Sequence, residues 1–159
     1  MKLMEITSSK GTYAAVKFDD KTVEALLQLI KDNKIPNGLT SKDFHSTICF
    51  SRKHLKNFKN LGDFSKDPWT GTPTRFGTFP NGPEKTAAIL FYKCSEQTKR
   101  FNEICDDYGA TWDYDKYHCH ITLSYDIDDY DMKKLDIKDI GPIIIVSEYT
   151  EELDLNKYK

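Results

Sequence analysis

The chain has 159 residues, a formal net charge of −2 and an aromatic share of 13%. That length suits one domain with a core of its own, and the slight acidity argues against a protein that holds long nucleic acid by neutralising phosphates. With no apolar run near the roughly 20 residues of a membrane span, no signal-peptide core and four scattered cysteines, we expect a reduced cytosolic protein rather than a disulfide scaffold.

The first predicted elements form a strand–helix–strand unit. Residues 12–18, TYAAVKF, are rich in β-prone side chains and predict a strand. Asp20 precedes a helical pattern over residues 21–33, so we expect it to cap that helix. A loop that contains proline and glycine then leads to a second strand over residues 44–51, FHSTICFS.

The same order of elements returns later in the chain. Residues 87–93, AAILFYK, predict a strand, and Ser95 is the expected cap of the helix that follows. Gly109 is placed to end this helix, as glycine commonly does. Residues 119–125 predict the closing strand.

Both units end in the same figure of histidine, one spacer, threonine and an aliphatic residue. The first copy is HSTI, from His45, and the second is HITL, from His120. Asp20 stands 25 residues before His45, and Ser95 stands 25 residues before His120. A lone H-x-T is common by chance, whereas two copies at matching positions of matching units indicate an internal duplication.

Further strands are expected near residues 74–79 and over residues 143–147, the latter continuing toward Leu153. We therefore expect an α+β fold in which duplicated β-α-β units form two antiparallel-type sheets around a central cleft. The whole chain, residues 1–159, is expected to be one domain with two pseudo-symmetric lobes, at about 11–52 and 86–126.

Strand alternation explains the motif. Side chains two apart share a face, so His45 lies beside Thr47, and His120 beside Thr122. If the two units pack about a pseudo-twofold axis, both pairs converge on one cleft. Two imidazoles can serve as general base and general acid near neutral pH, and the hydroxyls can hydrogen-bond phosphate oxygens on which charge develops. The sequence therefore predicts cleavage of a phosphodiester with a neighbouring 2′-hydroxyl, without metal or cofactor, and leaves open which histidine is the base.

At these residues the chain resembles a known family. HSTI and HITL are similar to the paired H-x-[ST]-hydrophobic motifs of the 2H phosphoesterase superfamily, which includes the LigT-like 2′–5′ RNA ligase-like proteins. The size, the beginning EITSSKGTYAAVKF and the ending SEYTEELDL further resemble the small phage-encoded anti-CBASS nucleases.

That second resemblance implies a substrate and further site residues. Members cleave cyclic di- and trinucleotide second messengers of bacterial immunity without metal, favour bonds next to adenosine, and leave a 3′-phosphate through a 2′,3′-cyclic phosphate. They hold the ligand with an N-terminal tyrosine and a C-terminal glutamate, which by position are Tyr13 and Glu148. A tryptophan expected near the C-terminus is absent, and Tyr158 is the aromatic that could replace it. A phage protein of this kind would act in the cytoplasm of the bacterial host.

Plainer structural roles stand beside these assignments. Thr47 and Thr122 could serve only as β-formers, Tyr13 as a packing aromatic, and Glu148 as part of a solvated acidic end. His118 is a candidate for the rim of the site. The run His118–Cys119–His120 could suggest zinc, yet alternation turns Cys119 to the opposite face. Other aromatic residues near strand ends could ring the cleft, namely Trp69, Trp112 and Tyr117.

Three other functions remain open on the sequence alone. An RNA 2′,3′-cyclic phosphodiesterase or 2′–5′ oligonucleotide hydrolase would use the same motifs. A sponge that sequesters nucleotides would need no acid and base pair, and a zinc hydrolase would need more ligands than these. The oligomeric state and the base preference do not follow from the residues.

Overall fold

The computed structural model describes residues 10–158. The strands are β1 (Lys10–Phe18), β2 (Ser46–Ser51), β3 (Gly62–Asp63), β4 (Trp69–Pro80), β5 (Thr86–Lys93), β6 (His120–Ser124) and β7 (Ile143–Asp154), and the helices are α1 (Asp20–Asp32) and α2 (Ser95–Tyr108). Short 3-10 turns lie at Met132–Lys134, Ile137–Asp139 and Leu155–Tyr158. The mixed α and β composition expected from the sequence is confirmed.

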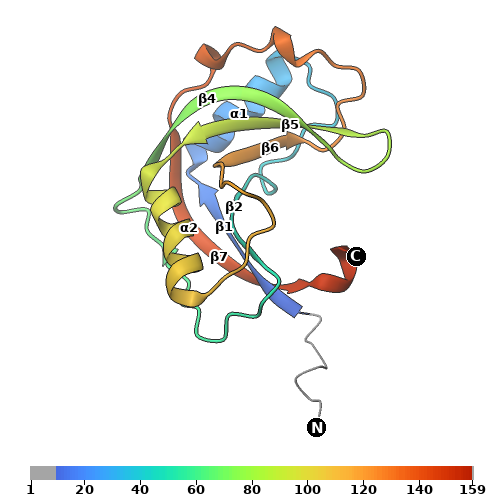
Figure 1. Ribbon diagram of the computed structural model, residues 1–159. Helices are drawn as coiled ribbons and strands as arrows, with labels where there is room; N and C mark the ends of the chain where they lie inside the picture. Colours follow the sequence, from blue (N-terminus) through green and yellow to red (C-terminus); the bar gives the residue numbers. More distant parts are fainter. Residues whose placement is uncertain (1–9, 159) are drawn as a thin grey trace.

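The strands of this part of the chain pair antiparallel in one open sheet of the order β2-β1-β7-β4-β5-β6, with β3 beside β7. Instead of two separate sheets, the strands form two halves that are joined where Trp69–Gly71 of β4 pairs with Ile143–Ile145 of β7. Figure 1 shows the sheet curling, with β4 and β5 arching over one end and β1 and β7 running along the other. The two motif strands, β2 and β6, are its opposite edges.

Both helices begin one residue earlier than the sequence suggested. The N-cap of α1 is Asp19, whose carboxylate accepts from the backbone N–H of Thr22 at 2.9 Å. Asp20 is instead the first helical residue, where its negative charge interacts favourably with the positive end of the helix dipole. The N-cap of α2 is Cys94 rather than Ser95, and its side chain makes no capping bond. Gly109 ends α2 with a φ of 75°, as expected.

The two halves carry β-bulges at corresponding places. In β2 the extra residue is Ile48, directly after Thr47, and in β6 it is Leu123, directly after Thr122. A second pair of bulges lies on the other side of the central strands, at Val146 of β7 against β1 and at Thr74 of β4 against β5. A bulge shifts the alternation of every residue beyond it, so the halves match in their irregularities as well as in their strands.

The core lies between the helices and one face of the sheet. Buried side chains of the helices, such as Leu26 and Phe101, belong to the same hydrophobic cluster as Val16, Leu90 and Ile121. The opposite face carries the alternate residues of β1 and β5. On that side Ala87, Ile89 and Phe91 form a small cluster of their own.

Candidate active site

The two motif histidines are held in the same way. The Nδ1 of His45 donates to the carbonyl oxygen of Asp43 at 2.8 Å, and the Nδ1 of His120 donates to that of His118 at 2.9 Å. A carbonyl oxygen can only accept, so the proton of each neutral imidazole lies on Nδ1 and its Nε2 keeps a lone pair. Each ring is thus prepared to take a proton at Nε2, or to give one when charged.

The electrostatics of His120 connect the two motifs. Burial lowers the pKa of His120, its hydrogen bond to the His118 carbonyl opposes this, and the charges of His45 and His118 lower the pKa further. The structure therefore brings the two imidazoles close enough for their charges to interact. A neutral His120 at pH 7 is the form in which Nε2 can act as a base.

Thr47, the threonine of the first motif, is hydrogen-bonded to Tyr13 of β1. The hydroxyls of Tyr13 and Thr47 lie 2.9 Å apart in a hydrogen bond, and the Tyr13 ring meets the His45 ring edge-on at 6.4 Å between centroids. Burial raises the pKa of Tyr13, so its hydroxyl stays protonated. Tyr13, Thr47 and His45 thus form one constellation. Thr122 is half-buried beside His120, and its hydroxyl makes no hydrogen bond within the described residues.

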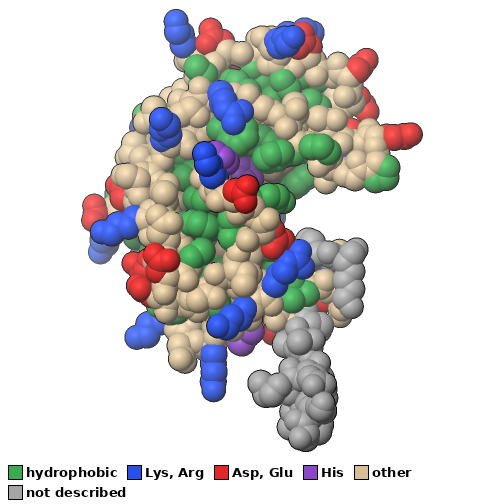
Figure 2. All heavy atoms as spheres, viewed as in Figure 1, with side chains coloured by type: hydrophobic (Ala, Val, Ile, Leu, Met, Phe, Trp, Pro, Cys, Tyr) green, Lys and Arg blue, Asp and Glu red, His purple; other side chains and the backbone are tan. Residues whose placement is uncertain are grey.

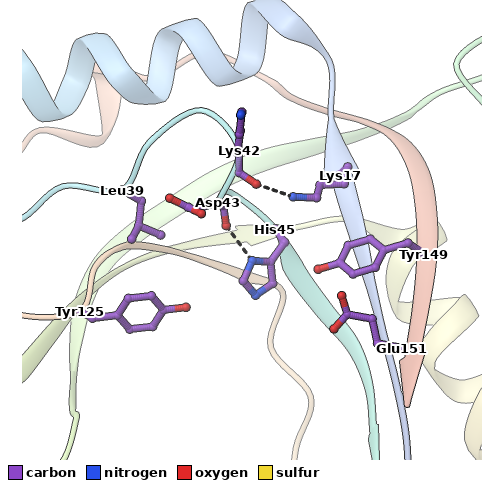
Figure 3. Close-up of a pocket in the computed structure, with 8 residues that line it drawn as sticks. All are labelled: Lys17, Leu39, Lys42, Asp43, His45, Tyr125, Tyr149 and Glu151. Atoms are coloured by element: carbon purple, nitrogen blue, oxygen red, sulfur yellow. Dashed lines mark hydrogen bonds between the residues drawn. The ribbon is translucent and has the colours of Figure 1, made fainter. Parts of the chain in front are cut away.

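A hollow of about 660 Å³ opens beside His45. Figure 3 shows its imidazole between Tyr125 and Tyr149, whose hydroxyls point toward it from opposite sides, with the Glu151 carboxylate below. Lys17 also lines the hollow, and its amine donates to the Lys42 carbonyl at 2.9 Å. Figure 2 shows a concave surface on which histidine side chains lie near hydrophobic side chains and near those of lysine or arginine.

Glu148 does not join these residues. Its side chain is fully buried and accepts from the guanidinium of Arg100, at 2.9 Å from Nε to one oxygen and at 2.8 Å to the other. The backbone N–H of Leu61 donates to it as well, at 3.0 Å. Since Arg100 belongs to α2, Glu148 lies on the helix side of the sheet, and its place is that of a buried ion pair.

The carboxylate that does reach the hollow is Glu151, which sequence reasoning missed. It pairs with Tyr13 across β1 and β7, and Tyr149 lies against Tyr13 at 6.4 Å between ring centroids. The bulge at Val146 decides which residues of the run SEYTEE face the histidines. Glu151 lies directly opposite Tyr13 in the register of β1 and β7, so the two side chains share a face. Working out this strand register is the step that could have pointed to Glu151.

A buried polar network ties the first motif to the segment before the second. The amide of Gln97, which is fully buried, donates to the Ser46 hydroxyl at 2.9 Å and to the Tyr117 hydroxyl at 2.7 Å. Tyr117 donates in turn to the carbonyl of Thr47 at 2.6 Å, and Tyr92 donates to the Gln97 oxygen at 2.5 Å. Tyr117 is therefore a structural link on the helix side rather than a rim residue.

The two tryptophans also pack away from the histidines. Trp69 packs on Phe64 with its ring tilted by 31° and 4.4 Å between ring centroids, and Trp112 meets Phe101 of α2 edge-on at 5.1 Å. His118 is exposed and contacts the Phe91 ring at 6.2 Å, which places it beside His120. The side chain of Tyr158 lies outside the described part of the chain.

Neither a metal cluster nor a membrane helix is found in residues 10–158. No three histidine, cysteine or acidic side chains there come together as a metal would require, and none of the helices is long and apolar enough to cross a membrane. Cys119 is buried on the core side, where its sulfur contacts the Thr98 hydroxyl at 3.8 Å.

Comparisons with known proteins agree on one family. A family model described as anti-CBASS protein Acb1 matches residues 10–159. The chain is 35% identical over 156 residues to the anti-CBASS protein Acb1 of Acinetobacter phage Ac42, with 98% of each chain covered. It is 30% identical to the protein of that name from Salmonella phage S16, over 98% of this chain and 95% of the other. The corresponding protein of Enterobacteria phage T4 is 29% identical, over 93% and 91%.

Proposed function

Because the chain belongs to the anti-CBASS protein Acb1 family, we propose that it counteracts this bacterial defence by hydrolysing cyclic di- or trinucleotide messengers, as a phosphodiesterase of the 2H phosphoesterase type. The observation that carries the proposal is the matched pair of imidazoles, each with Nδ1 held by the carbonyl two residues before it. The phage origin of the relatives supports an action in the cytoplasm of the infected host.

The first step breaks one 3′–5′ bond of the ring. Nε2 of the basic histidine takes the proton of the 2′-hydroxyl, and O2′ attacks the neighbouring phosphorus. The bond from phosphorus to O5′ breaks, and O5′ receives a proton from Nε2 of the other histidine. The product is a linear nucleotide with a 5′-hydroxyl and a 2′,3′-cyclic phosphate. Each proton transfer contributes roughly 10²–10⁴ in rate.

In the second step the histidines exchange roles. The one that gave its proton activates a water molecule, which attacks the cyclic phosphate, and the other protonates O2′ as it leaves. A 3′-phosphate remains. The lowered pKa of His120 supports it as the base of the first step and His45 as the acid.

The threonine hydroxyls act on the phosphate. Each lies two residues after its histidine, on the same side of an edge strand. A hydroxyl can donate to the non-bridging oxygens, on which negative charge builds in the transition state. Tyr13 keeps the Thr47 hydroxyl oriented through their 2.9 Å hydrogen bond, so Tyr13 acts as a positioning residue for phosphate binding.

The hollow beside His45 is proposed to hold a nucleobase, adenine in the first instance. Tyr125 and Tyr149 supply aromatic faces for stacking. The Glu151 carboxylate can accept from an exocyclic amine, which adenine has at N6. Glu151, rather than Glu148, is therefore the acidic residue that we assign to the ligand.

The first experiment incubates the protein, in EDTA, with 3′,3′-cGAMP, cyclic triadenylate and a linear RNA that ends in a 2′,3′-cyclic phosphate. Mass analysis should find linear products with 3′-phosphate from the cyclic substrates. Reaction of the linear RNA alone would move the protein to the RNA-processing branch of the superfamily. Tight binding of the rings without turnover would indicate a nucleotide sponge instead.

A further inference from the structure

Arg75 lies on the face of the sheet that carries the histidines, although it belongs to neither motif. Its guanidinium carbon is 3.9 Å from the centroid of the Phe91 ring. That ring in turn lies 6.1 Å from the His120 ring and 6.2 Å from the His118 ring. Phe91 pairs with Arg75 on β4 and with His120 on β6, so its ring lies between the guanidinium and the imidazole.

Three features of β4 and β5 put Arg75 there. The bulge at Thr74 shifts the alternation of β4, so that Arg75 comes to pair with Phe91. The Thr74 hydroxyl donates to the Phe91 carbonyl at 3.2 Å and fixes the bulge. Gly77 leaves room for the ring, because a Cβ there would lie 2.8 Å from the Phe91 ring and 3.3 Å from an Arg75 nitrogen.

Arg75 differs from the other two arginines of the chain in its partners. Arg52 binds the Asp113 carboxylate, and Arg100 binds Glu148 and a second acid on its own helix. Within residues 10–158, Arg75 makes no ion pair, and its side chain donates no hydrogen bond. Arg75 is an exposed residue, and the planar fork of N–H donors that a guanidinium carries matches phosphate oxygens.

The surroundings on the outer side of β4 are also basic. Lys133 and Lys134 line a shallow hollow together with Arg75, where Asp136 is the one acid. A phosphate that reached Arg75 would therefore meet a locally positive surface on a chain whose net charge is −2.

We propose that Arg75 binds the phosphate of the cyclic substrate that is not being cleaved. This inference rests on the proposed function, in which the scissile phosphate lies between the two Nε2 atoms. Because the Phe91 ring lies between the Arg75 guanidinium and His120, the guanidinium lies away from the scissile phosphate. A cyclic dinucleotide carries a second phosphate on the far side of its ring, and a simple dinucleoside monophosphate does not. Arg75 thereby selects rings over short linear substrates.

The test measures equilibrium binding in a His45→Ala background, which removes the proposed acid and slows turnover by about 10²–10⁴, so that the ring stays intact during the measurement. Arg75→Gln should weaken binding of cyclic diadenylate by about tenfold or more, the loss of a charge-assisted contact. Binding of linear ApA, which has a single phosphodiester, should change less than twofold. Arg75→Lys should recover part of the loss, because a lysine keeps the charge without the fork.

Arg52→Gln is the matched control, since it removes the same charge from an exposed arginine that pairs with Asp113; it should leave both affinities unchanged. Equal weakening of cyclic diadenylate and ApA by Arg75→Gln would place the guanidinium at the scissile phosphate and overturn the proposal, as would no weakening of either. Failure of the chain with native His45 to cleave any ring would overturn the proposed function alone, because this binding comparison does not depend on turnover.

Discussion

The hydroxyl of Tyr117 donates to the carbonyl oxygen of Thr47 across 2.6 Å, although 70 residues separate them. One residue belongs to the segment that leads into the second motif, and the other is the threonine of the first. The bond therefore links the two motifs through the backbone, and Gln97 braces it from α2 by donating to Tyr117 and Ser46.

Gln97→Leu should loosen this link while the fold persists. The substitution leaves the hydroxyls of Tyr92, Tyr117 and Ser46 without their buried partner, so we expect a loss of about 1–3 kcal/mol in the free energy of unfolding. It should also lower kcat more than it raises KM, because the relative placement of the histidines changes. Gln28→Leu on the exposed side of α1 is the control. Unchanged kcat in the destabilised variant would show that the network serves stability alone.

The roles of the two histidines can be separated with a substrate that has sulfur in place of the bridging O5′. A thiolate leaves without protonation, so this substrate has no need of a general acid. His45→Ala should lose about 10²–10⁴ in kcat on the oxygen substrate and recover most of that loss on the sulfur substrate. His120→Ala should lose activity on both. Recovery in His120→Ala instead would reverse the assignment.

The lowered pKa of His120 has a consequence for stability against pH. Because the folded state disfavours the charged imidazole, the unfolded chain binds more protons near and below the ordinary histidine pKa of 6.5. The contribution of neutral His120 to the free energy of unfolding is fully present above about pH 6.5. It is lost as the pH falls from there to the lower folded-state pKa. Urea unfolding at pH 8, 6.5 and 5 should show a smaller acid loss in His120→Gln than in the native sequence. Equal pH dependence in both would contradict the burial of a neutral His120.

Two glutamates three residues apart should behave oppositely. Glu148→Gln removes the fully buried one of the two carboxylates that Arg100 binds, and should cost about 3–5 kcal/mol in the free energy of unfolding. Glu151→Gln at the exposed hollow should change unfolding by less than about 0.5 kcal/mol, and should raise KM for an adenine-containing ring. Chemical denaturation and steady-state kinetics measure both. A Glu148→Gln protein of native stability with a raised KM would return Glu148 to the ligand site.

Tyr13→Phe tests the positioning of Thr47. Loss of the phenol removes one part-buried hydrogen bond, worth about 0.5–1.5 kcal/mol of stability. The freed Thr47 hydroxyl can then turn away from the phosphate, so kcat should fall while binding of the ring through aromatic contact persists. Tyr114→Phe, at a tyrosine that is 73% exposed, is the matched control. Equal kcat for both variants and the native sequence would remove Tyr13 from the mechanism.

The order and type of the main elements could be predicted from the sequence because hydrophobic periodicity and the repeated motif agree. The shared side of His45 and Thr47, and that of His120 and Thr122, follows from alternation over two residues. The start of α1 was displaced by one residue because neighbouring acids, Asp19 and Asp20, are equally good caps by type. Only the backbone angles choose between them.

Residues beyond a bulge could not be placed in the same way. By strict alternation over residues 44–51, Phe50 would lie on the face opposite to His45 and Thr47. The bulge at Ile48 instead brings Phe50 opposite Tyr13, with 6.4 Å between the ring centroids. The bulge at Val146 shifts the alternation of β7, so that Glu148 faces the helix side and Glu151, three residues later, faces the hollow. Arg75 looks like an ordinary exposed strand residue until the Phe91 ring is seen beneath it. These outcomes depend on one inserted residue in a strand, for which the sequence carries no local mark.

The sheet begins at β2 and ends at β6, so the two motif histidines lie at the opposite edges of a sheet that curls back on itself. These edge strands are called its margins. These margins contact one another, and a single bridge between Gly38 and Ser124 pairs backbone across that side of the molecule. On the proposed mechanism, the distance between base and acid is therefore set by this bridge and by the Tyr117–Thr47 hydrogen bond, because no strand ladder in residues 10–158 joins β2 to β6.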